Sequence, residues 1–253
     1  MPHQNLVSDA ALSRVLGVYA GMVSRVLRKP ERWLGVDEDP PLTAGLPIRI
    51  LDELRDRALG DITPASPGWA ALPESKRVDW WLRRIAIGAA LAAAAPRFAG
   101  ALADRLPLQA ALGASAAGLA VCVVAHERGT ADPAEWVPLL ARILFDRDLS
   151  AGTPVPLPTA QQSDDQLETA AGDTTEPPSG MAALAQGAQR VVRTLWRLAR
   201  TFLDLQNLFD KRPRGGLLAR SLAKVPIIGV AGGWLDERGA IRKAAKQTHH
   251  LLR

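Results

Sequence analysis

A set of basic residues in the C-terminal part of this sequence is the feature best suited to bind an anion. In a helix over residues 181–209, these cations fall within, or directly beyond, one arc of about 80°. They are Arg190, Arg193, Arg197, Arg200 and Lys211. Each base near an anionic membrane surface contributes about 1 kcal/mol of attraction, so five can hold a helix there reversibly. We therefore predict that these residues face an anion, with membrane lipid as the first choice.

Residues that could catalyse a reaction are few. His126 and Glu127 form the best acid–base pair, but His126 is expected at the C-terminal end of a helix, where an imidazole complements the helix dipole. His249 and His250 are adjacent and so lack the i, i+4 spacing of a helical metal site. No G-x-S-x-G motif occurs, and Cys122, the single cysteine, excludes a cysteine-rich zinc site. We predict a protein without catalytic activity, metal or cofactor.

Charge divides the chain into three parts. Residues 1–148 carry 17 Lys and Arg against 17 Asp and Glu, residues 149–180 carry none against five, and residues 181–253 carry 14 against four, so the net charges are 0, −5 and +10. The middle part also holds five prolines, and its composition buries too little apolar surface to order itself. With these boundaries we predict a helical body, a disordered acidic linker and a basic amphipathic helical module.

The body is predicted to be helical because its apolar residues are mostly Ala, Leu and Val. Polar caps, prolines and glycines delimit five helices, over residues 8–29, 47–59, 73–95, 107–128 and 133–144. The expected fold class is therefore all-α, a multi-helix bundle to which the basic C-terminal module is tethered.

One apolar segment raises the question of a membrane span. Residues 106–125 are 20 mostly apolar positions, which is long enough to cross a bilayer. The segment nevertheless contains Pro107, Gln109 and Ser115, and its bulk is weakly hydrophobic Ala. We favour a central helix buried inside the bundle over a transmembrane helix.

The side of the helix over residues 181–209 opposite the arginines is apolar, at alternating spacings of three and four. The residues along this seam are Met181, Leu184, Ala188, Val191, Leu195, Leu198, Phe202, Leu205 and Phe209. Three interpretations stay open: packing against helices of the same chain, association with a second copy or another protein, and docking on a membrane. Packing by the seam and docking by the arginines are compatible.

A glycine-rich apolar segment follows, with bases on both sides. Residues 225–234 are too few to span a bilayer, but they suit shallow insertion at the headgroup layer, where a Trp ring is stable. The residues assigned this interfacial role are Ile227, Ile228, Gly229, Gly232, Gly233 and Trp234. A tight helix–helix crossing needs the same glycines and is the alternative. The bases that follow are Arg238, Arg242, Lys243 and Lys246.

The run Ala223-Lys224-Val225-Pro226-Ile227-Ile228-Gly229-Val230-Ala231-Gly232-Gly233 precedes a polar helix rich in Arg, Lys and Ala. This ending resembles the closing signature of the EcsC protein family, bacterial helical proteins associated with the membrane. The resemblance covers about the last 35 residues of the 253. It implies proximity to a membrane and assigns no catalytic residue.

The function expected from these features is a non-catalytic, cytoplasmic scaffold or adaptor that docks on anionic lipid at the inner face of the cell membrane. No secretion signal is visible at the N-terminus, and the single cysteine fits a reducing compartment. The alternative is a nucleic-acid-binding protein that uses the basic C-terminal module, since an isoelectric point near 9.9 also favours phosphate backbones.

Overall fold

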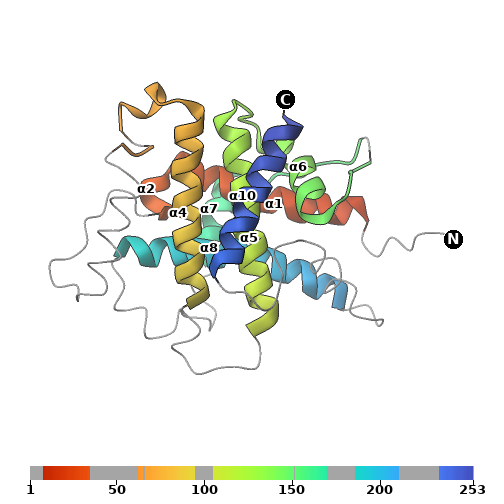
Figure 1. Cartoon of the computed structure of the whole chain (residues 1–253). Helices are drawn as coiled ribbons and strands as arrows, with labels where there is room; N and C mark the ends of the chain where they lie inside the picture. Colours follow the sequence, from red (N-terminus) through yellow and green to blue (C-terminus); the bar gives the residue numbers. More distant parts are fainter. Residues whose placement is uncertain are drawn as a thin grey trace.

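The computed structural model describes residues 8–34, 62–64, 66–94, 105–150, 152–169, 186–210 and 234–252. These residues form eight α-helices and one 3-10 helix, with no strand among them, which confirms the all-α multi-helix bundle (Figure 1). The elements are α1 (Asp9–Arg28), α2 (Pro30–Leu34), η1 (Trp69–Ala71), α4 (Glu74–Ala94), α5 (Arg105–Glu127), α6 (Pro133–Phe145), α7 (Ala160–Thr169), α8 (Gln186–Asp210) and α10 (Trp234–Leu251). The helix predicted over residues 47–59 lies outside the described residues.

Helix boundaries follow the capping residues that the sequence offers. The Ser8 hydroxyl accepts a hydrogen bond from the backbone N–H of Ala11 and starts α1, and Asp132 accepts from the N–H of Ala134 at the start of α6. Pro133 occupies the first turn of α6, where its missing N–H costs nothing. Asp146 then ends α6 in a left-handed conformation, with φ of 50°.

Helix α5 is the central element of the bundle. Residues 111–125 are all buried apart from Gly113, which is partly exposed. The helix packs against α1, α4, α6, α8 and α10. In Figure 1, α4, α5 and α10 run along one direction of the view, while α1 and α8 run across it. The prediction of a buried central helix is therefore confirmed for these residues.

Tyr19 fastens α1 to the helices that it crosses. Its ring is fully buried, and its hydroxyl donates to the backbone carbonyl of Ser115 in α5 at 2.6 Å. The same ring lies 4.9 Å from that of Phe202 in α8, centroid to centroid. Gly118 makes room for the ring, because a Cβ there would lie 2.9 Å from the Tyr19 hydroxyl.

The prediction of a disordered linker is wrong for residues 152–169. Residues 153–159 run along α1, where the Ser13 hydroxyl donates to the carbonyl of Pro154 at 2.6 Å. Gly17 lets the chain approach closely, since a Cβ there would lie 2.4 Å from the carbonyl oxygen of Pro156. Three of the prolines that suggested disorder, Pro154, Pro156 and Pro158, therefore lie against α1, beside Ser13, Gly17 and Gly21.

Helix α7, which follows this segment, is held to α1 and α2 by ion pairs. The Arg25 guanidinium donates to both carboxylate oxygens of Asp164, at 2.8 and 2.6 Å, and Arg32 pairs with Glu168. Leu167 is fully buried in the core. Two of the acids that suggested a solvated linker, Asp164 and Glu168, thus pair with bases of α1 and α2. Residues 170–180 lie outside the described part of the chain.

The C-terminal helices share the core of the body instead of forming a separate module. Among the described residues, α8 and α10 contribute Val192, Leu198 and Ile241 to the same hydrophobic cluster as α1, α4 and α5. The predicted division into a body and a tethered module therefore does not describe how these helices pack.

By length and composition, α1 alone among the described helices could cross a membrane. Two thirds of its most apolar window is buried inside the bundle, as in the core helix of a globular protein.

The contact of α4 with α8 depends on the absence of a side chain at Gly88. A Cβ there would lie 2.2 Å from Cγ1 of Val191, a branched and buried side chain that has little freedom to move. We predict that Gly88→Ala lowers the free energy of unfolding by about 1–3 kcal/mol, measured by urea denaturation. Gly239→Ala in α10 is the matched control: nothing lies within 4 Å of its Cβ, so it should raise stability by up to about 1 kcal/mol. Equal effects of the two substitutions would contradict the close approach.

Candidate functional site

The predicted arginine row of α8 is only partly accessible. Arg193 is exposed, whereas Arg190, Arg197 and Arg200 are partly buried. The row lies beside other elements of the chain, because α8 packs against α2 and α7. Arg190 donates a long hydrogen bond of 3.5 Å to the backbone carbonyl of Glu31 in α2.

The residues packed around α8 change the pKa of Arg197, a member of this row. Its burial and the charge of Arg193 lower the pKa of the guanidinium below its usual range, while Glu168 of α7 acts in the opposite direction. A carboxylate of the chain itself therefore competes with any external anion on this side of α8. Arg193 stays available to an anionic partner.

The apolar seam of α8 packs inside the chain. Val191, Leu195, Leu198 and Phe202 are at most 5% exposed and belong to the core. Of the three interpretations of the seam, packing within the chain is the one that holds for these residues, which leaves them unavailable to a second copy.

Several predicted residues cannot be placed. Met181, Leu184, Lys211, Ile227, Ile228, Gly229, Gly232 and Gly233 lie outside the described residues. Trp234 is the first residue of α10, and Leu205 and Phe209 belong to α8.

Helix α10 carries a cationic surface that the sequence analysis treated only as the flank of the glycine-rich segment. Ala240, Ile241, Ala244, Ala245 and Thr248 are buried. The exposed side bears the basic residues Arg242, Lys243 and Lys246. Residues 239–252 contain no Asp or Glu. The helical spacing of small apolar and basic residues was a signal that could have identified this surface.

A groove of about 780 Å³ lies next to this surface, between α4 and α10. Its apolar lining comes from three helices: Val78, Leu82, Ala86 and Ile87 of α4, Val124 of α5, and Ile241 and Ala245 of α10. Its lining also includes the charged residues Glu74, Asp79, Arg83, Arg242 and Lys246, and the imidazole of His249. No sequence pattern predicts this groove, because it forms only when α4 and α10 pack side by side over α5.

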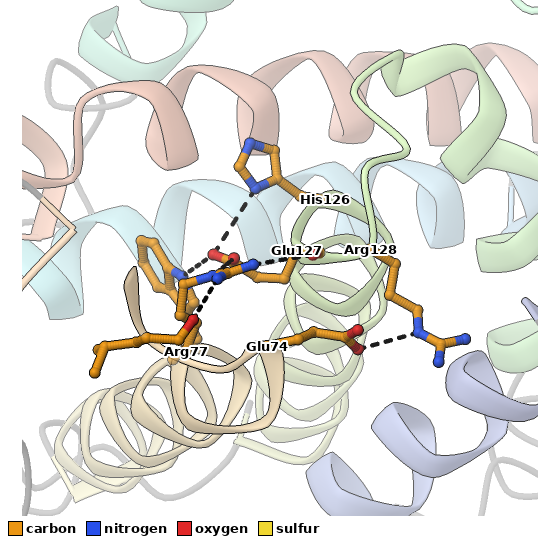
Figure 2. A network of polar contacts seen from close by, with 7 residues as sticks. Glu74, Arg77, His126, Glu127 and Arg128 are labelled. Atoms are coloured by element: carbon orange, nitrogen blue, oxygen red, sulfur yellow. Dashed lines mark hydrogen bonds and ion pairs between the residues drawn. The ribbon is translucent and has the colours of Figure 1, made fainter. Parts of the chain in front are cut away.

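Glu74 and His249 line the groove where α4 begins and α10 ends, and Arg128 bonds to both of them. Arg128 donates from Nε to Glu74 Oε1 at 3.1 Å (Figure 2). Its Nη1 donates to the backbone carbonyl of His249 at 3.3 Å. Its Nη2 lies 3.3 Å from Nε2 of His249. Since a guanidinium only donates, Nε2 must accept, which places the imidazole proton on Nδ1, 3.9 Å from Glu74 Oε1. The cluster joins the start of α4 to the ends of α5 and α10.

The Glu127 carboxylate accepts hydrogen bonds from two residues of α4, next to this cluster. Its Oε2 accepts from Nε of Arg77 at 2.6 Å, and its Oε1 accepts from the indole of Trp81 at 2.9 Å (Figure 2). The Glu127 side chain is only 6% exposed. Both oxygens are therefore occupied by structural donors, which leaves Glu127 poorly suited to act as a catalytic base.

His126 lies beside Glu127 at the end of α5, as predicted. Its Nδ1 is buried, has no hydrogen-bond partner within the described structure, and lies 3.9 Å from Glu127 Oε1. Burial lowers the pKa of the imidazole below 6.5, and Arg28 and Arg77 add to this effect against the attraction of Glu127. Folding thus favours the neutral form of His126.

Within the described residues, no group of three or more His, Cys, Asp or Glu side chains is placed to hold a metal ion. No protein-family model matches the chain, and no curated protein or solved structure matches it either. The resemblance of residues 223–233 to the EcsC family stays a prediction.

The Arg77–Glu127 pair should contribute strongly to stability, because it is mostly screened from water. We predict that Glu127→Gln lowers the free energy of unfolding by about 2–3 kcal/mol, since it leaves Arg77 without its counter-charge. Asp148→Asn is the control, because the Arg142–Asp148 pair is exposed and should contribute at most about 1 kcal/mol. Urea denaturation measures both, and an equal loss in the two variants would contradict this assignment.

The lowered pKa of His126 predicts a pH dependence of stability. The unfolded chain binds a proton near pH 6.5, and the folded protein binds it only at lower pH. The free energy of unfolding should therefore fall as the pH drops below 6.5 and level off below the folded-state pKa. His126→Gln should remove this part of the decline in unfolding curves measured between about pH 5 and 8. An unchanged decline in the variant would show that another group causes it.

Proposed function

We propose that the protein is a non-catalytic scaffold or adaptor that docks peripherally on anionic membranes through the basic surface of α10. The observation that carries the proposal is the exposure of Arg242, Lys243 and Lys246 on one helix whose residues 239–252 include no acid. None of the three bases has an ion-pair partner within the described part of the chain.

The size of the attraction fits reversible docking. At about 1 kcal/mol for each base near an anionic leaflet, three bases contribute about 3 kcal/mol. This attraction is screened over a Debye length of about 10 Å at 0.1 M salt, so the protein should leave the membrane as salt is raised. Apolar contact at the neighbouring groove would add to this attraction.

The arginines of α8 are the weaker candidate for the docking surface. Glu168 lies close enough to Arg197 to shift its pKa, and Arg32 and Glu168 already form an ion pair on the same side of the bundle. Among the described arginines of α8, Arg193 is the one classed as exposed, whereas Arg190, Arg197 and Arg200 are partly buried.

Charge reversal tests the proposal. We predict that Arg242→Glu, Lys243→Glu and Lys246→Glu together weaken sedimentation with phosphatidylglycerol vesicles about 100-fold or more at low salt, with unchanged helical circular dichroism. The control reverses three other exposed bases, Arg14 and Arg28 of α1 and Lys29 at its C-cap, and so changes the net charge equally.

The control variant should keep most of its vesicle binding. Equal losses in the two variants would show that only net charge matters and would reject α10 as the docking surface. Nucleic-acid binding would instead appear as salt-sensitive retention of wild-type protein on DNA together with no sedimentation by vesicles of any composition.

A further inference from the structure

We propose that the groove between α4 and α10 binds one single-chain anionic amphiphile, such as an alkyl phosphate or a fatty acid. The alkyl chain lies on the apolar floor, and the anionic head lies between Arg242 and Lys246. The inference rests on the proposed docking function for its choice of lipid and adds a defined site for one molecule.

The floor of the groove has the composition that an alkyl chain requires. On α4, Val78, Leu82 and Ala86 follow one another at i, i+4 and form one continuous apolar row. Ile241 and Ala245 form the equivalent row on α10. The volume of about 780 Å³ lies within the range of about 300–1,000 Å³ that is usual for sites that enclose small organic ligands.

The rim of the groove selects the charge of the head. Arg242 and Lys246 lie one turn apart on α10, line the groove and are exposed. Glu74, one of the two acids in the lining, is already paired with Arg128. Asp79 is the other acid, and it shares its side of α4 with Arg83 one turn away. The α10 side of the rim is therefore the positive side, and a negative head fits there.

The length of the groove suits a chain of moderate length. Glu74 and His249 mark one end of the lining, and Ile87 and Ile241 lie toward the other, since α4 and α10 run antiparallel. From Ile241 to His249, α10 rises by about 12 Å. A second copy of the chain is a poor occupant, because it would bring the same basic α10 against this rim.

The dependence of affinity on the length of the ligand's alkyl chain distinguishes this groove site from a site that binds by charge alone. Full-length protein is titrated calorimetrically with hexyl, octyl and decyl phosphate below their micellar concentrations, and with inorganic phosphate. Each methylene that leaves water should tighten binding about fourfold, so each step of two carbons lowers Kd about 16-fold. Equal affinities across the series, or affinities equal to that of inorganic phosphate, would overturn the proposal.

Two pairs of variants locate the site. Ala86→Phe fills the groove and should weaken decyl phosphate binding about tenfold, whereas Ala11→Phe, at a partly exposed position of α1 outside the groove lining, should not. Arg242→Glu with Lys246→Glu should weaken it about 30-fold, whereas Lys243→Glu, exposed on α10 but outside the lining, should not. Equal losses within either pair would overturn the assignment. Because the charge variants leave the groove volume unchanged, the test does not depend on how well Ala86→Phe folds.

Vesicle sedimentation distinguishes failure of this inference from failure of the docking function. Wild-type protein that binds phosphatidylglycerol vesicles but not decyl phosphate would dock by its surface charge alone, and the groove site would be rejected. If it binds neither, both proposals fail. If Ala86→Phe loses decyl phosphate binding and keeps its vesicle binding, the groove is a site for a single amphiphile beside the docking surface.

Discussion

The structure depends on the burial of α5, a helix that is apolar nearly all round. Water cannot cover such a helix, so other helices must do so on every side. Helices α1, α4, α6, α8 and α10 supply this cover, and residues 114–125 are buried without exception. Each covering helix needs an apolar side toward α5 and a polar side toward water, and this requirement decides where the charges of the chain are displayed.

The two basic regions of the C-terminal part consequently differ. On one side of the bundle, α7 brings Asp164 and Glu168 to bases of α1 and α2, and Glu168 also acts on Arg197 of α8. On α10, whose first turn holds Asp236 and Glu237, residues 239–252 carry exposed bases and no acid. Positive charge without a partner among the described residues therefore lies on α10, next to a groove whose floor includes Val124 of α5 itself. The same packing that buries the central helix places apolar surface beside free positive charge.

Local features of the fold could be predicted from the sequence, whereas pairings across the fold could not. Ser8 and Asp132 mark the starts of α1 and α6 because capping is a short-range interaction. The prediction of a disordered linker was wrong for residues 152–169, because composition shows that prolines and acids are present but not which residues they contact in the fold. Gly17 leaves room for the carbonyl of Pro156, and Arg25 donates to Asp164, across more than 130 residues of sequence. The helical periodicity of the sequence placed the arginine row on one helix, and these arginines do lie in α8. The cover of that row by α2 and α7, and the groove beside α10, depend on tertiary packing and could not be predicted.

The most direct test of this account is to ask which helix touches the membrane. Cys122 is fully buried, so a fluorophore can be attached selectively to a cysteine at an exposed position. Gln247→Cys on α10 and Gln161→Cys on α7 offer a matched pair of exposed sites. With anionic vesicles that carry a headgroup quencher, the account predicts quenching of the label at position 247 and little at position 161. Quenching of both labels to the same degree, or of the α7 label alone, would contradict docking through α10.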